Sequence, residues 1–167
     1  LSLLQDDSVG ARRNADEALR RNPASVDALV AQGDIARFDG LTVAAIAAYT
    51  QAAKIAPNDV RPWLGLGVIE TERDNFGVAS GYLEKAVKLD AQSATAWGEL
   101  ASLETSKGDY ARALEAFQKS LTLQPDNVVM LTGKGILELK TGNNEAAINT
   151  LLRASLIEPR YARAHLY

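Results

Sequence analysis

Large and small apolar positions recur along the chain with a spacing of 34 residues. In each copy a bulky residue is followed four positions later by a small one, and the bulky positions are Leu29, Trp63, Trp97 and Leu131. Other apolar residues of each copy lie three or four positions apart, which is the spacing of one helix face. Each copy therefore predicts two amphipathic helices of about 12 to 14 residues, joined by a tight turn.

Polar residues at the helix starts and glycines at the helix ends repeat with the same period. The predicted N-caps are Ser25, Asp59, Ser93 and Asn127. The predicted ends of the first helices, where glycine tolerates a left-handed backbone, are Gly40, Asp74, Gly108 and Gly142. These signals predict four complete units, at residues 26–59, 60–93, 94–127 and 128–161.

Small residues mark the places where the two helices of a unit cross, because bulky side chains would hold the backbones apart. The first helices supply Gly33, Gly67, Ala101 and Gly135, and the second helices supply Ala45, Ala79, Ala113 and Ala147. Residues 1–25 are interpreted as the C-terminal part of a truncated repeat whose first helix is reduced to LSLLQ. Residues 162–167 are interpreted as the start of a further, truncated repeat. We expect a segment of a longer array.

The residues Trp63, Leu66, Gly67 and Ala79, repeated in part as Trp97, Leu100, Ala101 and Ala113, resemble the tetratricopeptide repeat (TPR) family over residues 26–161. This resemblance implies an all-α fold, a right-handed superhelix (α-solenoid) of antiparallel helix pairs with a 34-residue period. It also implies a non-catalytic protein-protein interaction scaffold that binds a partner segment in the concave groove of the superhelix.

One departure from the family pattern recurs, because Glu70, Glu104 and Glu138 stand where the family usually has tyrosine. The first unit has Ala36 at this place. We interpret the three glutamates as a structural ladder that accepts hydrogen bonds from the neighbouring unit. A set of ligands is the alternative, but no histidine or second carboxylate series accompanies them to form a metal site.

The concave groove of such an array is lined by the first helices of successive units. Helical spacing from the caps assigns to it Val30, Asp34, Arg37, Leu64, Val68, Glu99, Ser102, Thr132, Ile136 and Leu139. Its apolar members are at positions that the packing of the units does not require. We therefore expect a cover, either a partner segment or the array's own neighbouring helices.

Composition narrows the functional classes. The net charge of −3 argues against nucleic acid as a partner, and no apolar run approaches the ~20 residues of a membrane-spanning helix. The chain has no cysteine, and its one histidine, His165, cannot build a catalytic triad or a histidine metal site alone. Gly65-Leu66-Gly67 and Gly133-Lys134-Gly135 lie inside predicted helices and are not phosphate loops. We expect no enzyme activity, cofactor or metal.

The partner is predicted to be a protein or peptide segment. In the family, modules that grip a C-terminal carboxylate use lysine, asparagine and arginine, but the matching positions here are Val30, Asp34, Gly65, Thr95 and Glu99. A carboxylate clamp is therefore not expected. Self-association through open repeat ends stays open, as does a cytoplasmic or bacterial periplasmic location. The alternatives are an architectural segment of a bacterial secretion or exopolysaccharide-export protein, or the docking arm of an enzyme.

Overall fold

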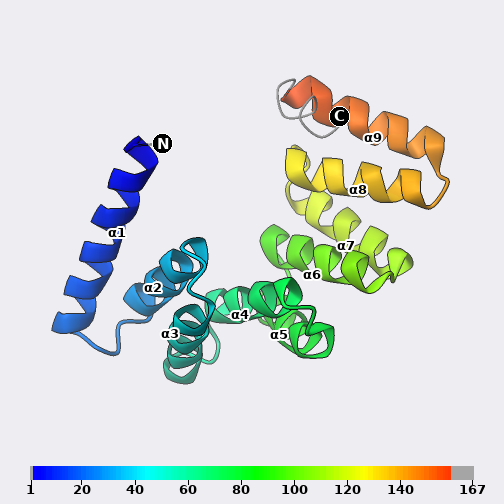
Figure 1. Ribbon diagram of the computed structural model, residues 1–167. Helices are drawn as coiled ribbons and strands as arrows, with labels where there is room; N and C mark the ends of the chain where they lie inside the picture. The colour runs from blue at the N-terminus through cyan, green and yellow to red at the C-terminus, as the bar shows by residue number, and fades with distance from the viewer. Residues whose placement is uncertain (1, 159–167) are drawn as a thin grey trace. The chain divides into compact units, whose positions relative to one another are not determined.

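A computed structural model describes the backbone of residues 2–158 and the side chains of residues 10–158. Figure 1 shows that these residues form α-helices joined by short turns, and the described part contains no strand. The helices are α1 (Ser2–Arg21), α2 (Val26–Phe38), α3 (Thr42–Ile55), α4 (Val60–Glu72), α5 (Phe76–Leu89), α6 (Ala94–Lys107), α7 (Tyr110–Leu123), α8 (Val128–Lys140) and α9 (Asn144–Ile157). The predicted all-α helical repeat fold, of the α-solenoid class, is confirmed.

Every predicted N-cap is present. The Ser25, Ser93 and Asn127 side chains each accept a hydrogen bond from the backbone N–H three residues later, and Asp59 accepts from Arg61. The predicted helix ends are also left-handed, with φ of 73° at Gly40, 58° at Asp74, 81° at Gly108 and 82° at Gly142. Asp74 is the one described non-glycine residue with a positive φ. The second repeat, residues 60–93, therefore ends its first helix with a residue that is less suitable than glycine.

The helices cluster into two compact units, Leu1–Leu89 and Asp90–Tyr167. In the first unit, α2 pairs with α3 and α4 pairs with α5, while α1 packs on α2 and α3 packs on α4. In the second unit, α6 pairs with α7, α8 pairs with α9, and α7 packs on α8. Figure 1 shows these helices as antiparallel pairs, which is the arrangement that the tight turns predict.

The N-terminal helix corrects one expectation. The chain was expected to keep only LSLLQ of an earlier first helix, separate from the helix that follows, but α1 runs without a break from Ser2 to Arg21. No proline and no left-handed residue interrupts it, so nothing in this stretch ends a helix. The truncated repeat predicted at residues 162–167 lies outside the described residues.

The small residues lie where the helices of a pair approach each other. A Cβ atom added to Gly67 would lie 2.5 Å from a methyl carbon of Leu83, and one added to Gly135 would lie 2.6 Å from Leu151. Ala45, Ala79, Ala113 and Ala147 on the opposing helices are fully buried. These distances leave no room for a side chain, and so they explain the repeated glycines and alanines.

Two tryptophans make the same contacts in different units, although only their spacing was visible in the sequence. The Trp63 indole N–H donates to the carbonyl oxygen of Pro57, and the Trp97 indole N–H donates to that of Ala91, at 3.0 and 2.9 Å. An ammonium group from the second helix of the same pair lies over each ring: Lys85 over Trp63 and Lys119 over Trp97. Each tryptophan thus ties the loop before its helix to the helix pair.

The three glutamates act within their own helix pairs, so the predicted ladder between units is wrong. Their cationic partners are Arg73 for Glu70, Lys107 and Arg112 for Glu104, and Lys134 for Glu138. Asn75 also donates to Glu70. Each carboxylate lies in the last two turns of its first helix and is buried, and its cationic partners come from that helix, from the residue that ends it, or from the paired helix.

Candidate functional site

The first helices of the first unit, α2 and α4, carry five of the predicted groove residues. Val30 was expected to be free of packing, but it is only 7% exposed and belongs to the hydrophobic core with Leu29 and Leu66. That expectation is wrong, because the Val30 side chain turns towards the α3 and α4 side of its helix pair. Leu64 and Val68 are half-buried, and Asp34 and Arg37 are exposed.

Tyr49 reaches this face from α3. Its ring passes between two glycines of different helices, because a Cβ added to Gly33 or to Gly65 would lie 2.6 or 2.4 Å from ring atoms. Beyond the glycines, the Tyr49 hydroxyl donates a hydrogen bond of 2.6 Å to Asp34 Oδ1. Burial, followed by this hydrogen bond, raises the pKa of the Tyr49 hydroxyl well above its usual range.

Two ion pairs join α2 to α4 on the same face. Arg61 Nη2 lies 2.8 Å from Asp27 near the helix starts, and Arg37 Nη1 lies 3.4 Å from Glu72 near the helix ends. Arg61 also holds Asp59, and its side-chain hydrogen bonds lower the pKa of that carboxyl. Asp34 and Arg37 were predicted to contact a partner, and both already bind groups of this chain.

The second unit carries the other five predicted residues on α6 and α8. Ser102 is exposed, and its hydroxyl donates back to the Gly98 carbonyl of its own helix. Glu99 is half-buried. Thr132 is 7% exposed, and its hydroxyl has no hydrogen-bond partner among the described residues. Ile136 and Leu139 are 49% and 45% exposed, as a groove position requires.

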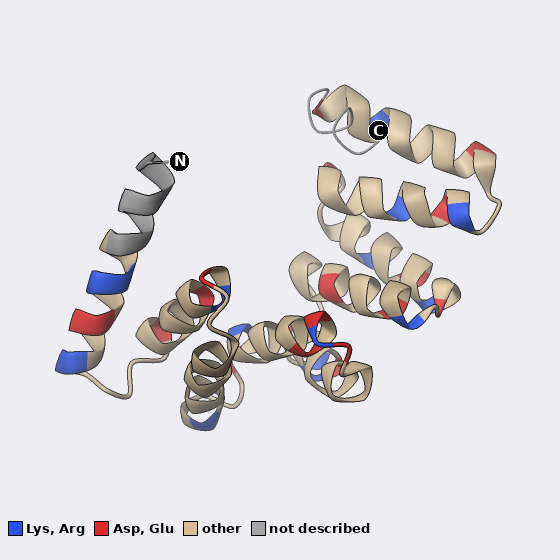
Figure 2. Cartoon of the chain, in the orientation of Figure 1, with Lys and Arg blue, Asp and Glu red and all other residues tan. Residues whose placement is uncertain are grey.

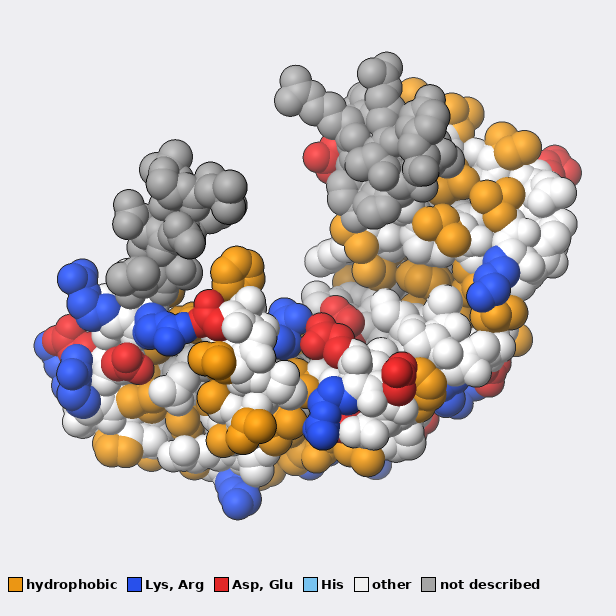
Figure 3. Space-filling view, in the orientation of Figure 1, with side chains coloured by type: hydrophobic (Ala, Val, Ile, Leu, Met, Phe, Trp, Pro, Cys, Tyr) orange, Lys and Arg blue, Asp and Glu red, His pale blue; other side chains and the backbone are white. Residues whose placement is uncertain are grey.

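An apolar stripe therefore runs along α8. Val129, which is 51% exposed, precedes Ile136 by two helical turns, and Leu139 follows one turn later. Each of these side chains leaves about half of its surface in water. A partner that covered this apolar surface would gain about 25 cal/mol of binding free energy per Å2 buried. Figure 3 shows hydrophobic side chains gathered on the visible surface of the α8–α9 pair. Among the described residues, this stripe is the apolar part of the predicted surface that stays about half-exposed.

The described residues offer an exposed apolar surface on α8. No group of three or more histidine, cysteine, aspartate or glutamate side chains comes together within residues 10–158 in a way that could hold a metal ion. The two glycine pairs that resemble phosphate loops lie inside α4 and α8 and contact Tyr49, Leu83, Phe117 and Leu151. Figure 2 shows that acidic and basic residues alternate along the helices instead of gathering by sign.

None of the described helices combines the length and the apolar character that crossing a bilayer requires.

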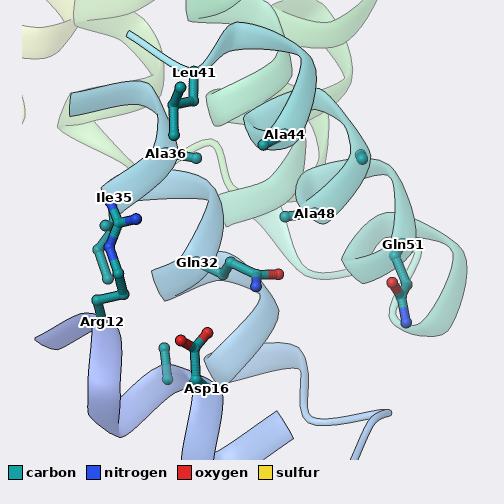
Figure 4. Close-up of a pocket in the computed structure, with 11 residues that line it drawn as sticks. Arg12, Asp16, Gln32, Ile35, Ala36, Leu41, Ala44, Ala48 and Gln51 are labelled. Atoms are coloured by element: carbon teal, nitrogen blue, oxygen red, sulfur yellow. The ribbon is translucent and has the colours of Figure 1, made fainter. Parts of the chain in front are cut away.

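A second surface feature was not predicted from the sequence. A recess of about 340 Å3 lies in the first unit between α1, α2 and α3. Figure 4 shows Ala36, Ala44, Ala48 and Leu41 around it, with the Asp16 carboxylate directed towards it from α1. Gln32 extends across its middle from α2. The recess is on the side of the pair opposite to the α2–α4 face, because α1 and α3 line it together.

The chain is similar in sequence to one family of repeat proteins. Two models of the tetratricopeptide repeat match the chain, one at residues 6–60 and 63–128 and the other at residues 104–166. Together the matches extend over most of the sequence. A search of curated proteins gives no significant match.

Solved structures with the same architecture share little sequence with the chain. MamA matches with a TM-score of 0.77 at 22% identity, over 96% of this chain and 94% of the other. YrrB, a TPR protein with an unusual peptide-binding site, matches with a TM-score of 0.68 at 20% identity, over 95% and 82%. The O-GlcNAc transferase of Thermobaculum terrenum matches with a TM-score of 0.76 at 24% identity, over 81% of this chain and 26% of the enzyme. At these identities the likeness concerns the fold alone.

Proposed function

The chain belongs to the tetratricopeptide repeat family, and we propose that it binds a segment of a partner protein along the exposed face of its first helices. Repeats of this family are protein-interaction scaffolds, and they are typically not catalytic. The unusual peptide-binding site of YrrB, a solved structure of the same fold, supports a peptide as the kind of partner.

The main observation that supports this proposal is the apolar stripe on α8. Val129, Ile136 and Leu139 are about half-exposed in one line, although the packing of α8 on α7 and α9 is already satisfied by buried residues such as Leu131 and Leu137. A helix face that neither fills a core nor is polar has a role outside the helix pair. Three anchors spaced over about three turns suit an apolar stretch of a bound peptide or helix.

The chemistry of the partner follows from the side chains around the stripe. The ammonium group of Lys134 lies 2.8 Å from Glu138, and that of Lys140 lies 4.8 Å from the ring centroid of Tyr110, so both nearby cations have partners in the chain. A partner that needed a carboxylate clamp would have to break these contacts. We therefore propose a mainly apolar segment that binds without its C-terminal carboxylate and with little dependence on salt.

The test is the selection of peptides from a random display library with the wild type and with the double variant Ile136→Glu and Leu139→Glu. Wild type should enrich peptides with spaced apolar residues, and the variant should lose them by at least about tenfold in affinity, since two anchors are lost. Leu152→Glu is the matched control because Leu152 is similarly exposed, at 56%, on α9. Equal enrichment by the double variant, with an unchanged melting temperature, would refute the proposal.

A docking arm for an enzyme is a second candidate. One observation favours it: the matched part of the Thermobaculum terrenum transferase is only 26% of that chain, so the same fold occurs there within a much longer enzyme. Under this proposal the α8 stripe would hold the enzyme's protein substrate. Fusion of the chain to an unrelated catalytic domain should then accelerate modification of the selected peptides, and Ile136→Glu should remove the acceleration.

A further inference from the structure

We propose that the recess between α1, α2 and α3 is a second binding site, which takes the phenol ring of a tyrosine side chain from a partner protein. The site does not depend on the proposed function of the α8 stripe, because it is in the other compact unit and on the second-helix side of its pair. The inference rests on the shape of the recess, on a comparison between repeats, and on two polar groups at its mouth.

The recess is lined by small residues at three positions where the corresponding position one repeat later carries a large side chain. Ala36 stands at the place of the buried Glu70, Glu104 and Glu138. Ala48 stands 34 residues before Tyr82. On the helix before the repeat, Ala15 stands 34 residues before Tyr49. These three small side chains line the cavity that Figure 4 shows.

The next repeat shows what this register position accepts. Tyr82, the counterpart of Ala48, is half-buried, and its ring packs against the core cluster and lies 5.9 Å from the Trp63 ring centroid. The fold therefore accommodates an aromatic ring from this position. In the first repeat the walls are methyl groups of Ala44, Ala47 and Ala48, which give a flat ring a shallow apolar surface.

The mouth of the recess requires a hydrogen-bond donor. The Asp16 carboxylate and the Gln32 amide both border it, and neither side chain has a hydrogen bond or ion pair to another described residue. Arg12, also at the rim, is already paired with Asp39. A phenol hydroxyl donates to a carboxylate, and such a charge-assisted bond is stronger than a neutral one.

A cationic ligand suits the site less well. Arg13 and Arg20 lie within about one helical turn of Asp16 on α1, so they would repel a bound ammonium group. A neutral donor on an apolar ring avoids this repulsion. The recess volume of about 340 Å3 is large enough to admit one aromatic ring.

The experiment titrates the whole chain with N-acetyltyrosine amide, p-cresol and toluene, followed by the NMR signals of the alanine methyl groups. N-acetyltyrosine amide and p-cresol should both bind with a Kd on the order of 1 mM. Ring currents should shift the Ala44 and Ala48 methyl signals. Toluene should bind at least about tenfold more weakly, because it lacks the hydroxyl.

Three variants separate the site from unspecific binding. Asp16→Ala should reduce p-cresol binding to the level of toluene, while Asp16→Asn, which keeps an acceptor, should retain part of it. Ala48→Tyr should fill the recess as Tyr82 does and abolish binding, whereas Ala111→Tyr on the exposed surface of α7 should not. If Ala48→Tyr does not fold, Ala44→Leu serves the same purpose.

Several outcomes would overturn the proposal. Absence of methyl shifts up to the solubility limit of the probes would exclude the site. Equal binding of toluene and p-cresol would exclude the role of Asp16. Binding of p-cresol without binding of N-acetyltyrosine amide would exclude a protein tyrosine and indicate a free small phenol as the ligand.

Discussion

Close contacts with neighbouring side chains determine which positions of this chain must be glycine, and Gly65 is the clearest example. A Cβ atom there would lie 2.4 Å from the Tyr49 ring, which is bound by Asp34 and cannot move aside easily. Gly65→Ala should therefore destabilise the protein by about 1 to 3 kcal/mol. Gly81→Ala is the matched control, since nothing lies within 4 Å of its Cβ position on α5. Its gain in helix propensity should stabilise the protein by up to about 1 kcal/mol.

The cause of the Gly65 effect is testable in the same melting experiments. Tyr49→Leu on its own should be destabilising, because it loses the hydrogen bond to Asp34 and some ring contacts. Combined with Gly65→Ala, it should remove most of the cost of the added methyl group. Simple addition of the two single effects would contradict a steric origin.

Protonation of Asp59 gives a pH prediction. Its hydrogen bonds to Arg61 lower the pKa of the carboxyl in the folded state. A lowered folded pKa means that the unfolded chain takes up this proton first as the pH falls. The stabilisation is therefore complete above the unfolded pKa of about 3.9 and is lost as the pH falls through the lower folded value.

Asp59→Asn isolates this contribution, since asparagine caps a helix about as well as aspartate. Urea melts between pH 6 and pH 2 should show that the wild type loses more stability on acidification than the variant. The difference should appear below about pH 4. An identical loss in both proteins would show that the Arg61 contact has no net effect.

At the scale of elements, the turn after each first helix contains a residue with a left-handed backbone. In one repeat this residue is aspartate, which is less stable in that conformation than glycine. Asp74 has a φ of 58°, while its counterpart Gly108 has a φ of 81°. A side chain in this conformation costs about 1 kcal/mol relative to glycine. Asp74→Gly should therefore raise the stability by about 0.5 to 1 kcal/mol, and Gly108→Asp should lower it by a similar amount. Effects of the same sign in both variants would contradict this explanation.

Elements were predictable from the sequence because their signals are local. Caps such as Ser25 and Asn127 lie next to the helices that they start, so spacing alone placed them and fixed the helix lengths to within a residue or two. The side of a helix is less certain, since a neighbouring position is turned by about 100°. Val30 was assigned to the groove on this basis and is in the core.

Contacts that depend on three elements were out of reach of sequence reasoning. The path of Tyr49 from α3, between glycines of α2 and α4, requires the geometry of all three helices. The contact of Glu104 with Arg112 joins α6 to α7, so it required the geometry of the turn between these helices, whereas Lys107 is on the same helix as Glu104. The recess was not predicted because it forms where side chains are small, and small residues at these positions are not a recognisable sequence motif.

For the whole molecule, the clustering of the helices into Leu1–Leu89 and Asp90–Tyr167 leads to a prediction about separate fragments. Each unit has its own buried core, around Tyr49 in the first and around Leu131 in the second. Residues 1–89 and 90–167, expressed apart, should each be helical by circular dichroism and should each unfold in a concentration-independent transition. A fragment without helical signal would show that the stability of that unit depends on the other.

The contact between Tyr49 and Gly65 also constrains how such a sequence can change over evolutionary time. Sixteen residues separate the two positions, and the same separation joins Phe117 to Gly133, whose Cβ would lie 2.9 Å from the Phe117 ring. Within residues 10–158, the other two pairs at this spacing, Ala15 with Ala31 and Leu83 with Glu99, have no aromatic ring and no glycine. The aromatic ring of such a pair must therefore be replaced before its glycine can be replaced by a residue with a side chain. In homologous arrays, the two positions of each pair should change together.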